Sequence, residues 1–202
     1  MLRMIFLCLL AGTLCSCNAD KGAGASSSGA TSPGKGASSL EPSSQKMTPA
    51  PMTLRSSAFG NGDSIPEKYT CTGADISPPL SWSAPPGGAV SLALIVQDPD
   101  APGGTFTHWV LFALNPSTRM LFEGASPSGA VPKGAVEGTN DFGKTGYGGP
   151  CPPSGTHRYF FRVYALDAAV TGGQSLIGKQ LFKAMQGHVL AVGELMGRYR
   201  KP

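Results

Sequence analysis

The alternation of hydrophobic and polar positions predicts several buried strands between about residue 53 and residue 166. Residues 91–97 form a near-continuous apolar run, which is typical of a strand covered on both faces. Residues 108–114 have the same character, and residues 158–166 are rich in aromatic and β-branched side chains, which favour strands. Residues 53–59 and 80–82 are shorter candidates. The pattern therefore predicts a β-rich domain that begins near residue 53.

One segment has helical periodicity instead. Apolar side chains recur at helical spacing between residues 177 and 190, so we expect an α-helix there. Gly193 and Gly197 lie in the last apolar segment, residues 191–199, and favour a final strand over a longer helix. Many strands with one late helix predict a mostly β fold with a sandwich-like core.

The start of the chain has the pattern of an export signal. Arg3 precedes an apolar stretch over residues 4–14, which is too short to span a bilayer. This stretch ends in Leu14-Cys15-Ser16-Cys17, which resembles the bacterial lipobox. We therefore expect residues 1–16 to be a lipoprotein signal peptide and Cys17 to carry lipid. An ordinary cleaved secretory signal is the alternative.

Lipid on Cys17 would place the protein in the bacterial cell envelope, because more than one acyl chain anchors a protein stably to a membrane. Asn18 follows, and a residue other than Asp at this position resembles the outer-membrane default of Gram-negative bacteria. Residues 17–53 contain the lipidated Cys and then mostly Ser, Gly, Ala and Pro, which predicts a disordered tether. The folded domain is expected over residues 54–202.

The charge of the chain argues against a nucleic-acid partner. The formal net charge is only +4 and charged residues make up 14% of the sequence. No run of Lys and Arg is interleaved with aromatic residues, as a nucleic-acid-binding surface would require.

Polar side chains gather where apolar strands begin or end. Asp98-Pro99-Asp100-Ala101-Pro102 directly follows residues 91–97, and its two prolines fix the backbone of the turn. Thr107-His108-Trp109 opens the next strand. A loop rich in Gly and Pro, residues 147–156, leads into His157-Arg158-Tyr159. Strand ends and rigid turns of this kind are able to bring distant side chains into one concavity.

The ordered set of these motifs resembles the phosphatidylethanolamine-binding protein family, and most closely its bacterial Raf-kinase-inhibitor-like branch. The resemblance covers about residues 54–199. The motifs are DPDAP at 98–102, HW at 108–109, HRY at 157–159, SPPLSW at 77–82, NDFG at 140–143 and GHVLA at 187–191. It implies a large central β-sheet packed on a smaller sheet, with the late α-helix at about 177–190.

The resemblance also implies a small pocket for phosphate, a phospholipid headgroup or a similar anion. Carried over position by position, the ligand-binding residues are Asp98, Pro102, His108, Gly149, Cys151, Pro153, His157 and Tyr159. Two His and a Tyr offer hydrogen-bond donors to phosphate oxygens.

Further groups near these residues suit the same ligand. The backbone N–H groups of Gly148, Gly149 and Cys151 are expected to form an anion-binding nest. Asp98 is expected to accept a hydrogen bond from an imidazole and favour its charged form, or to accept one from a ligand ammonium. Affinity for phosphate-type ligands is then expected to rise as the pH falls from 8 to 6.

Two of the remaining polar side chains are expected to be structural. Arg158 points away from its neighbours on a strand, so we expect it to pair with Asp100 or Asp141. His188 lies within the helical pattern and is expected to be a satisfied polar residue.

Cys71 and Cys151 remain once the leader is removed and Cys17 is lipidated. A secreted protein with two such cysteines normally pairs them, so we expect a disulfide that fixes the pocket loop to the segment around residue 71. A redox or metal site is the alternative, but the chain has no CxxC pair.

Two other classes of function stay open. Asp98, His108 and His157 have the composition of a two-His-one-carboxylate metal site, and with a nearby Ser they would resemble a hydrolase triad. The chain has no Gly-x-Ser-x-Gly motif and no His pair at helical metal-ligand spacing, so we expect neither an enzyme nor a cofactor. The resembled family also includes inhibitors of kinases and proteases, which suggests a protein partner outside the cytoplasm, or a homodimer.

Overall fold

The computed structural model describes residues 48–202 of the chain. The predicted signal peptide, the lipidation of Cys17 and most of the predicted tether lie outside the described residues. Within residues 48–202, no helix has both the length and the apolar character that a membrane span needs.

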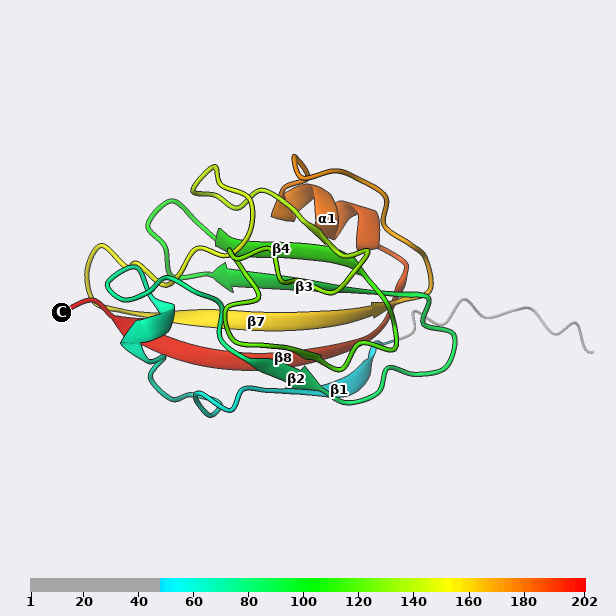
Figure 1. The fold of residues 1–202 in the computed structure, drawn as a ribbon, viewed down its shortest axis with the longest axis horizontal. Helices are drawn as coiled ribbons and strands as arrows, with labels where there is room; N and C mark the ends of the chain where they lie inside the picture. The colour runs from blue at the N-terminus through cyan, green and yellow to red at the C-terminus, as the bar shows by residue number, and fades with distance from the viewer. Residues whose placement is uncertain (1–47) are drawn as a thin grey trace, which may run out of the picture. The chain divides into compact units, whose positions relative to one another are not determined.

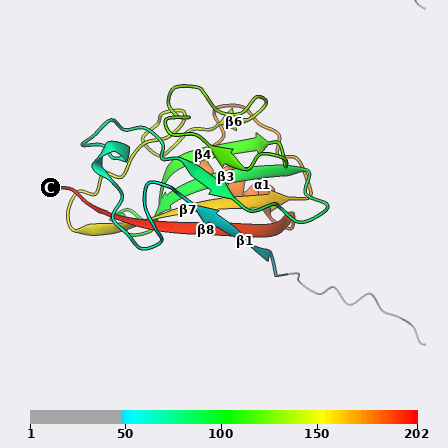
Figure 2. The same cartoon turned by 60° about the horizontal axis from the view of Figure 1, so that its bottom comes forward.

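The described residues form a mostly β fold with one α-helix and one eight-stranded sheet, which confirms the predicted class. The strands are β1 (Ala50–Arg55), β2 (Leu80–Trp82), β3 (Ser91–Asp98), β4 (Phe106–Leu114), β5 (Met120–Leu121), β6 (Val136–Glu137), β7 (Thr156–Leu166) and β8 (Val189–Arg200). The helices are a 3₁₀ turn, η1 (Glu67–Tyr69), and α1 (Gly178–Met185). The strand order is β5-β2-β1-β8-β7-β3-β4-β6, and Figures 1 and 2 show the long strands β8, β7, β3 and β4 side by side.

The continuous apolar run in β3 is explained by cover on both faces of the sheet. Leu94 and Val96 point into the main core, while Ala93 and Ile95 point into a second core on the other face. Leu181 and other residues of α1 close the second core. Both faces of β3 are therefore buried, and its polar side chains are confined to its two ends.

The smaller sheet expected from the resemblance is a continuation of the large one. Residues 50–53 of β1 pair in parallel with β8, and the next residues, Leu54 and Arg55, pair with β2 instead. β2 in turn pairs with β5. Because Leu54 and Trp82 share the main core with Leu94, the sheet curls over its own interior.

The structure corrects the start of the folded domain. β1 begins at Ala50, before the expected boundary at residue 53, and ends at Arg55 rather than at residue 59. The earlier start follows from the parallel pairing with β8 and from the buried side chain of Met52. A short segment of the predicted tether is therefore part of the sheet.

The predicted helix over residues 177–190 is too long at its C-terminal end. α1 ends at Met185, and Gly187 then adopts a positive φ of 82°, a conformation that a glycine adopts without strain. Val189 fits the helical spacing in the sequence, but in the structure it is the first residue of β8 and pairs with Leu166. The final strand expected over residues 191–199 therefore begins two residues earlier.

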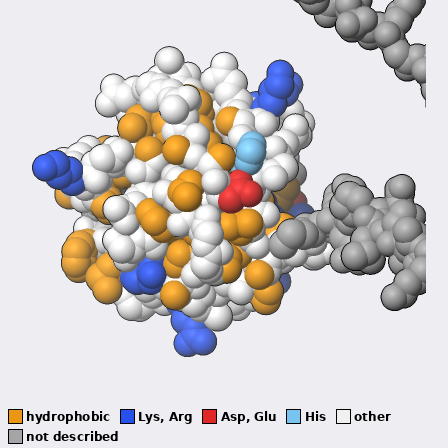
Figure 3. All heavy atoms as spheres, turned by 90° about the vertical axis from the view of Figure 1, so that its right-hand side faces the viewer, with side chains coloured by type: hydrophobic (Ala, Val, Ile, Leu, Met, Phe, Trp, Pro, Cys, Tyr) orange, Lys and Arg blue, Asp and Glu red, His pale blue; other side chains and the backbone are white. Residues whose placement is uncertain are grey.

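His188 lies between α1 and β8 rather than in the helix. Its Nδ1 donates to Asp167 Oδ1 at 2.8 Å on the surface. Figure 3 shows this end of the domain, where an imidazole and a carboxylate lie side by side.

Candidate ligand-binding site

The candidate site lies where β3 ends beside the starts of β4 and β7. Both neighbours run antiparallel to β3, so the end of β3 meets their beginnings. Asp98 closes β3, Phe106 opens β4 opposite it, and His157 lies near the start of β7. The sheet topology thus joins three motifs that are far apart in the sequence.

A β-bulge aims His108 into this site. Val96 pairs with Trp109, and the next residue of β3, Gln97, pairs with Thr107, which leaves His108 without a residue opposite. Regular alternation would place His108 and Trp109 on opposite faces of the sheet, and a bulge removes that constraint. The His108 ring packs edge-on against Tyr159, with centroids 5.2 Å apart.

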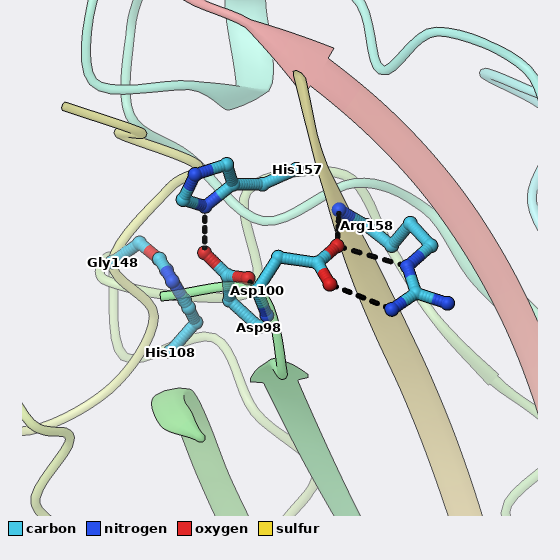
Figure 4. Close-up of polar contacts among 6 residues, drawn as sticks. All are labelled: Asp98, Asp100, His108, Gly148, His157 and Arg158. Carbon is cyan, nitrogen blue, oxygen red and sulfur yellow. Dashed lines mark hydrogen bonds and ion pairs between the residues drawn. The ribbon is translucent and has the colours of Figure 1, made fainter. Parts of the chain in front are cut away.

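The turn after β3 holds two neighbouring residues of β7 with its two carboxylates (Figure 4). His157 Nδ1 donates to Asp98 Oδ2 at 2.7 Å, and both side chains are buried. Asp98 Oδ1 accepts from the backbone N–H of Asp100 at 2.8 Å, which fixes the turn.

The second carboxylate, Asp100, binds Arg158 on the outside of the strand. It accepts from Arg158 Nη2 at 2.6 Å and from Nε at 2.9 Å. The hydrogen bonds from Arg158 lower the pKa of Asp100 to about 2. Arg158 therefore pairs with Asp100, one of the two predicted partners, whereas Asp141 accepts from the backbone of Thr107.

His108 is set up as a neutral imidazole. Its Nδ1 donates to the carbonyl oxygen of Gly148 at 2.7 Å. Burial lowers its pKa, although the Gly148 carbonyl opposes that shift. With the proton on Nδ1, the other ring nitrogen, Nε2, presents a lone pair instead of the donor that the sequence argument expected.

The Tyr159 hydroxyl is a buried polar group without a partner. Its oxygen is fully buried and makes no hydrogen bond of ordinary geometry within the described part of the chain. The Asp98 carboxylate and the Cys151 backbone are its polar neighbours, and burial, followed by Asp98, raises the pKa of Tyr159. An orphaned buried hydroxyl costs free energy, so its position beside a cavity is informative.

The predicted backbone nest is wrong at two of its three positions. The Gly148 N–H donates to the His108 carbonyl at 2.9 Å, and the Gly149 N–H donates to Asp75 Oδ1 at 2.6 Å. These two donors build the loop and are not free for an anion. Gly149 is needed for close approach, because a Cβ there would lie 2.6 Å from the Tyr69 carbonyl oxygen.

The predicted disulfide between Cys71 and Cys151 is confirmed, with Cα atoms 5.4 Å apart. The backbone N–H of Cys71 also donates to the Pro150 carbonyl at 3.1 Å. The two links fix the Gly/Pro-rich loop to the segment after η1.

These elements enclose a cavity of about 180 Å³. The residues that line it are Asp98, Ala101, Pro102, Phe106, His108, Phe142, Cys151 and Pro153. Of the predicted ligand-binding residues, Gly149, His157 and Tyr159 are not among them. Instead they hold the loop, bond the Asp98 carboxylate and pack edge-on against His108, respectively.

Sequence reasoning missed three lining residues. Ala101 and Phe142 belong to motifs that the sequence already singled out, and Phe106 lies two residues before His108. The rings of Phe106 and Phe142 pack edge-on, with centroids 4.7 Å apart, and each also contacts the His108 ring. Nothing in the sequence assigned these phenylalanines to the site, because an apolar side chain near a strand is usually part of a core.

The Asp98–His157 pair and His108 do not form a metal-ligand set. Across residues 48–202, no group of three or more His, Cys, Asp or Glu side chains is placed to bind a metal ion. The alternative of a hydrolase stays a prediction that nothing here tests.

Comparison with known proteins identifies the family and its fold. The family model for phosphatidylethanolamine-binding protein matches residues 55–200. The chain belongs to the phosphatidylethanolamine-binding protein family. Within it, a protein of Methanothermobacter thermautotrophicus called UPF0098 protein is 50% identical over 150 residues, which cover 74% of this chain and 99% of the relative. A UPF0098 protein of Chlamydia muridarum is 46% identical over 155 residues, covering 74% and 99%.

Solved structures of this family share the fold. The crystal structure of a putative phosphatidylethanolamine-binding protein homologue from Chlamydia trachomatis is 44% identical and gives a TM-score of 0.68, covering 77% of this chain and all of that one. Escherichia coli YbcL, described as a member of the mammalian family, is 31% identical with a TM-score of 0.71, covering 75% and 99%.

Proposed function

We propose that this domain binds a small phosphate-type oxyanion, either free or as the headgroup of a phospholipid. One observation carries the proposal: the Tyr159 hydroxyl is fully buried without a partner, next to Asp98 and Cys151, which line the cavity. Buried polar groups are nearly always hydrogen-bonded in folded proteins. The hydroxyl has no exposed surface in this structure, so a ligand oxygen would satisfy it only after a small shift of the cavity wall.

The size of the cavity limits the ligand. About 180 Å³ corresponds to roughly six water molecules at about 30 Å³ each. Pockets for drug-sized molecules are usually larger, from about 300 Å³ upward. The cavity therefore suits an ion or a headgroup of a few heavy atoms, and acyl chains would have to stay outside.

Proton uptake by His108 supplies a second donor. Burial lowers the pKa of His108, so the neutral ring is favoured and its Nε2 is an acceptor. A bound oxyanion places negative charge beside the ring and favours the imidazolium. Binding is then coupled to protonation of His108, and lower pH favours both.

The test is isothermal titration calorimetry of phosphate and phosphoethanolamine between pH 8 and pH 6. We expect affinity to rise as the pH falls. Because phosphate itself titrates in this range, the informative comparison is with His108→Gln, which should reduce the pH dependence to that of the ligand alone. His188→Gln, which changes an exposed histidine at the other end of the sheet, is the matched control and should behave like the wild type. Identical pH profiles for His108→Gln and the wild type would contradict the donor role of His108.

We also propose that the domain acts outside the cytoplasm, held to a membrane by lipid on Cys17. The lipobox-like sequence ending at Cys17 supports this location, and so does the Cys71–Cys151 disulfide, since disulfides persist mainly in oxidising compartments. Cell fractionation tests it. Cys17→Ala should move the protein from the membrane to the soluble fraction, and a wild-type protein that is already soluble would contradict the anchor.

A further inference from the structure

A separate cavity of about 380 Å³ lies on the opposite face of the sheet, beside the start of α1. Gln97 and Thr107, which pair across β3 and β4, belong to its lining. Alternate residues of a strand point to opposite faces, and Ile95, two residues before Gln97, packs in the core that α1 covers. This cavity, which we call the α1 cavity, shares no lining residue with the cavity that Asp98 lines. It is therefore independent of the site proposed above.

A buried hydroxyl in the α1 cavity has no partner. Thr107 is only 4% exposed, and it touches the first residue of α1, since a Cβ on Gly178 would lie 2.7 Å from its Oγ1. The backbone N–H of Thr107 donates to Asp141, but its hydroxyl makes no hydrogen bond within residues 48–202. Buried hydroxyls nearly always have a partner. A polar group of a ligand in the α1 cavity would satisfy this one.

The other polar side chains of the lining are also largely unused. Gln97, Thr105 and Lys179 make no hydrogen bond or ion pair through their side chains to any described residue. Asp141 accepts the Thr107 backbone N–H at 2.6 Å with Oδ2, which leaves Oδ1 available. The cavity thus offers both donors and acceptors to a ligand.

A larger cavity beside β1 and β8 lacks this property. It measures about 460 Å³, and Ser56, Asn61 and Glu194 belong to its lining. Each of these three side chains is already hydrogen-bonded within the protein. Volume alone therefore does not decide which cavity is suited to a polar ligand.

Two opposite charges line the α1 cavity from different elements. Lys179 belongs to the first turn of α1, where the helix dipole also favours negative charge, and Asp141 belongs to the loop bonded to the start of β4. Neither side chain forms an ion pair with another described residue. A neutral ligand such as a sugar would leave both charges unmatched, whereas a free amino acid carries one charge of each sign.

We propose that the α1 cavity binds a free amino acid with an apolar side chain. The carboxylate of the ligand binds Lys179 at the start of α1, and its ammonium group donates to Asp141, beside the Thr107 hydroxyl. Ile177 and Phe182 form the apolar part of the lining, and Ile177 is 36% exposed, so an apolar ligand side chain would shield it from water. A volume of about 380 Å³ lies within the range of about 300–1,000 Å³ that is usual for small-molecule sites.

The experiment is titration calorimetry with L-leucine and with two analogues that each lack one of its charges. 3-Methylbutylamine lacks the carboxylate, and 4-methylpentanoate lacks the ammonium group. At pH 7 and constant ionic strength we expect leucine to bind at least about 10-fold more tightly than either analogue, because each analogue loses hydrogen bonds to a charged group.

Variants of the two charged residues assign the contacts. Lys179→Gln should weaken leucine binding by about 10-fold and bring its affinity close to that of 3-methylbutylamine. Asp141→Asn keeps an oxygen for the Thr107 N–H and should bring leucine close to 4-methylpentanoate instead. Lys183→Gln, which removes a lysine of the same helix outside the cavity, is the control and should bind leucine like the wild type.

Each result bears on this inference separately from the oxyanion site. Lack of leucine binding to the wild type at millimolar concentration would overturn the proposal, and equal affinities for leucine and its analogues would overturn the pairing of both charges. These wild-type comparisons need no variant to fold. Unchanged leucine affinity in a folded Lys179→Gln protein would place the ligand elsewhere. Phosphate affinity should be the same in Lys179→Gln and the wild type, because the two cavities have no lining residue in common.

Discussion

Two His–Asp pairs lie at opposite ends of the sheet, and they make the same contact but differ in their exposure to solvent. In both, the imidazole Nδ1 donates to a carboxylate, at 2.7 Å for His157–Asp98 and 2.8 Å for His188–Asp167. The side chains of the first pair are 10% and 4% exposed, whereas those of the second are 49% and 45% exposed. The two contacts have the same geometry, but only the second pair is surrounded by water.

The comparison teaches that surroundings, more than the pair itself, decide what a His–Asp contact does. Water screens the exposed pair, so the pairing contributes little to the free energy of unfolding. Little water reaches the buried pair, so either partner alone would be left without a hydrogen bond. A cavity and the unpartnered hydroxyl of Tyr159 lie beside this pair. A functional assignment therefore belongs to the end of the sheet that holds Asp98.

The largest expected effect is on stability. Asp98→Ala should lower the free energy of unfolding by about 3 kcal/mol, because it leaves the buried His157 without its partner. Asp167→Ala should cost less than about 1 kcal/mol, since its partner is exposed. Urea denaturation of both variants without ligand measures the difference. Equal losses would mean that burial does not distinguish the two pairs.

A smaller effect is expected on affinity. Tyr159→Phe should weaken phosphate binding by about 10-fold or somewhat more, because the ligand loses a hydrogen bond to a charged oxygen. Stability should stay the same or rise slightly, since the unpartnered buried hydroxyl is removed. Tyr164→Phe, on the face of the same strand that α1 covers, is the control and should change neither phosphate affinity nor the site. An unchanged affinity in Tyr159→Phe would remove this hydroxyl from the binding account.

The smallest effect concerns the third carboxylate pair, Asp100–Arg158, which lies beside the site but outside the cavity. Its folded-state pKa of about 2 is below the ordinary value, so its contribution is present above about pH 4 and is lost as the pH falls toward 2. Asp100→Asn should therefore be slightly less stable than the wild type at pH 7, and the difference should shrink as the pH falls to about 2. Thermal unfolding at several pH values measures this. A difference at pH 2 as large as the one at pH 7 would contradict the assignment.

Much of the fold was predictable from the sequence because the central strands are buried on both faces. The apolar runs in β3 and β4 and the aromatic character of β7 leave few alternatives to a buried strand. The ends of elements were less predictable. Val189 fits a helical spacing and a strand equally well, and only its pairing with Leu166 decides between them.

The candidate site was predictable as a set of residues but not as a set of roles. The ordered motifs bring Asp98, His108 and His157 into one region, as the resemblance implied. Which atoms are left for a ligand depends on neighbours that no local pattern reveals. The Gly149 N–H is taken by Asp75, and the His108 proton is held by Gly148.

By itself, the sequence determined the β class, the two-proline turn and the supply of polar side chains at strand ends, because these follow from local periodicity and backbone restriction. The tertiary structure alone decided that His108 turns inward at a bulge, that Tyr159 keeps an unpaired hydroxyl, and that a carboxylate lines the cavity. The physical reason is that register, burial and the partner of each proton depend on contacts between segments that are remote along the chain.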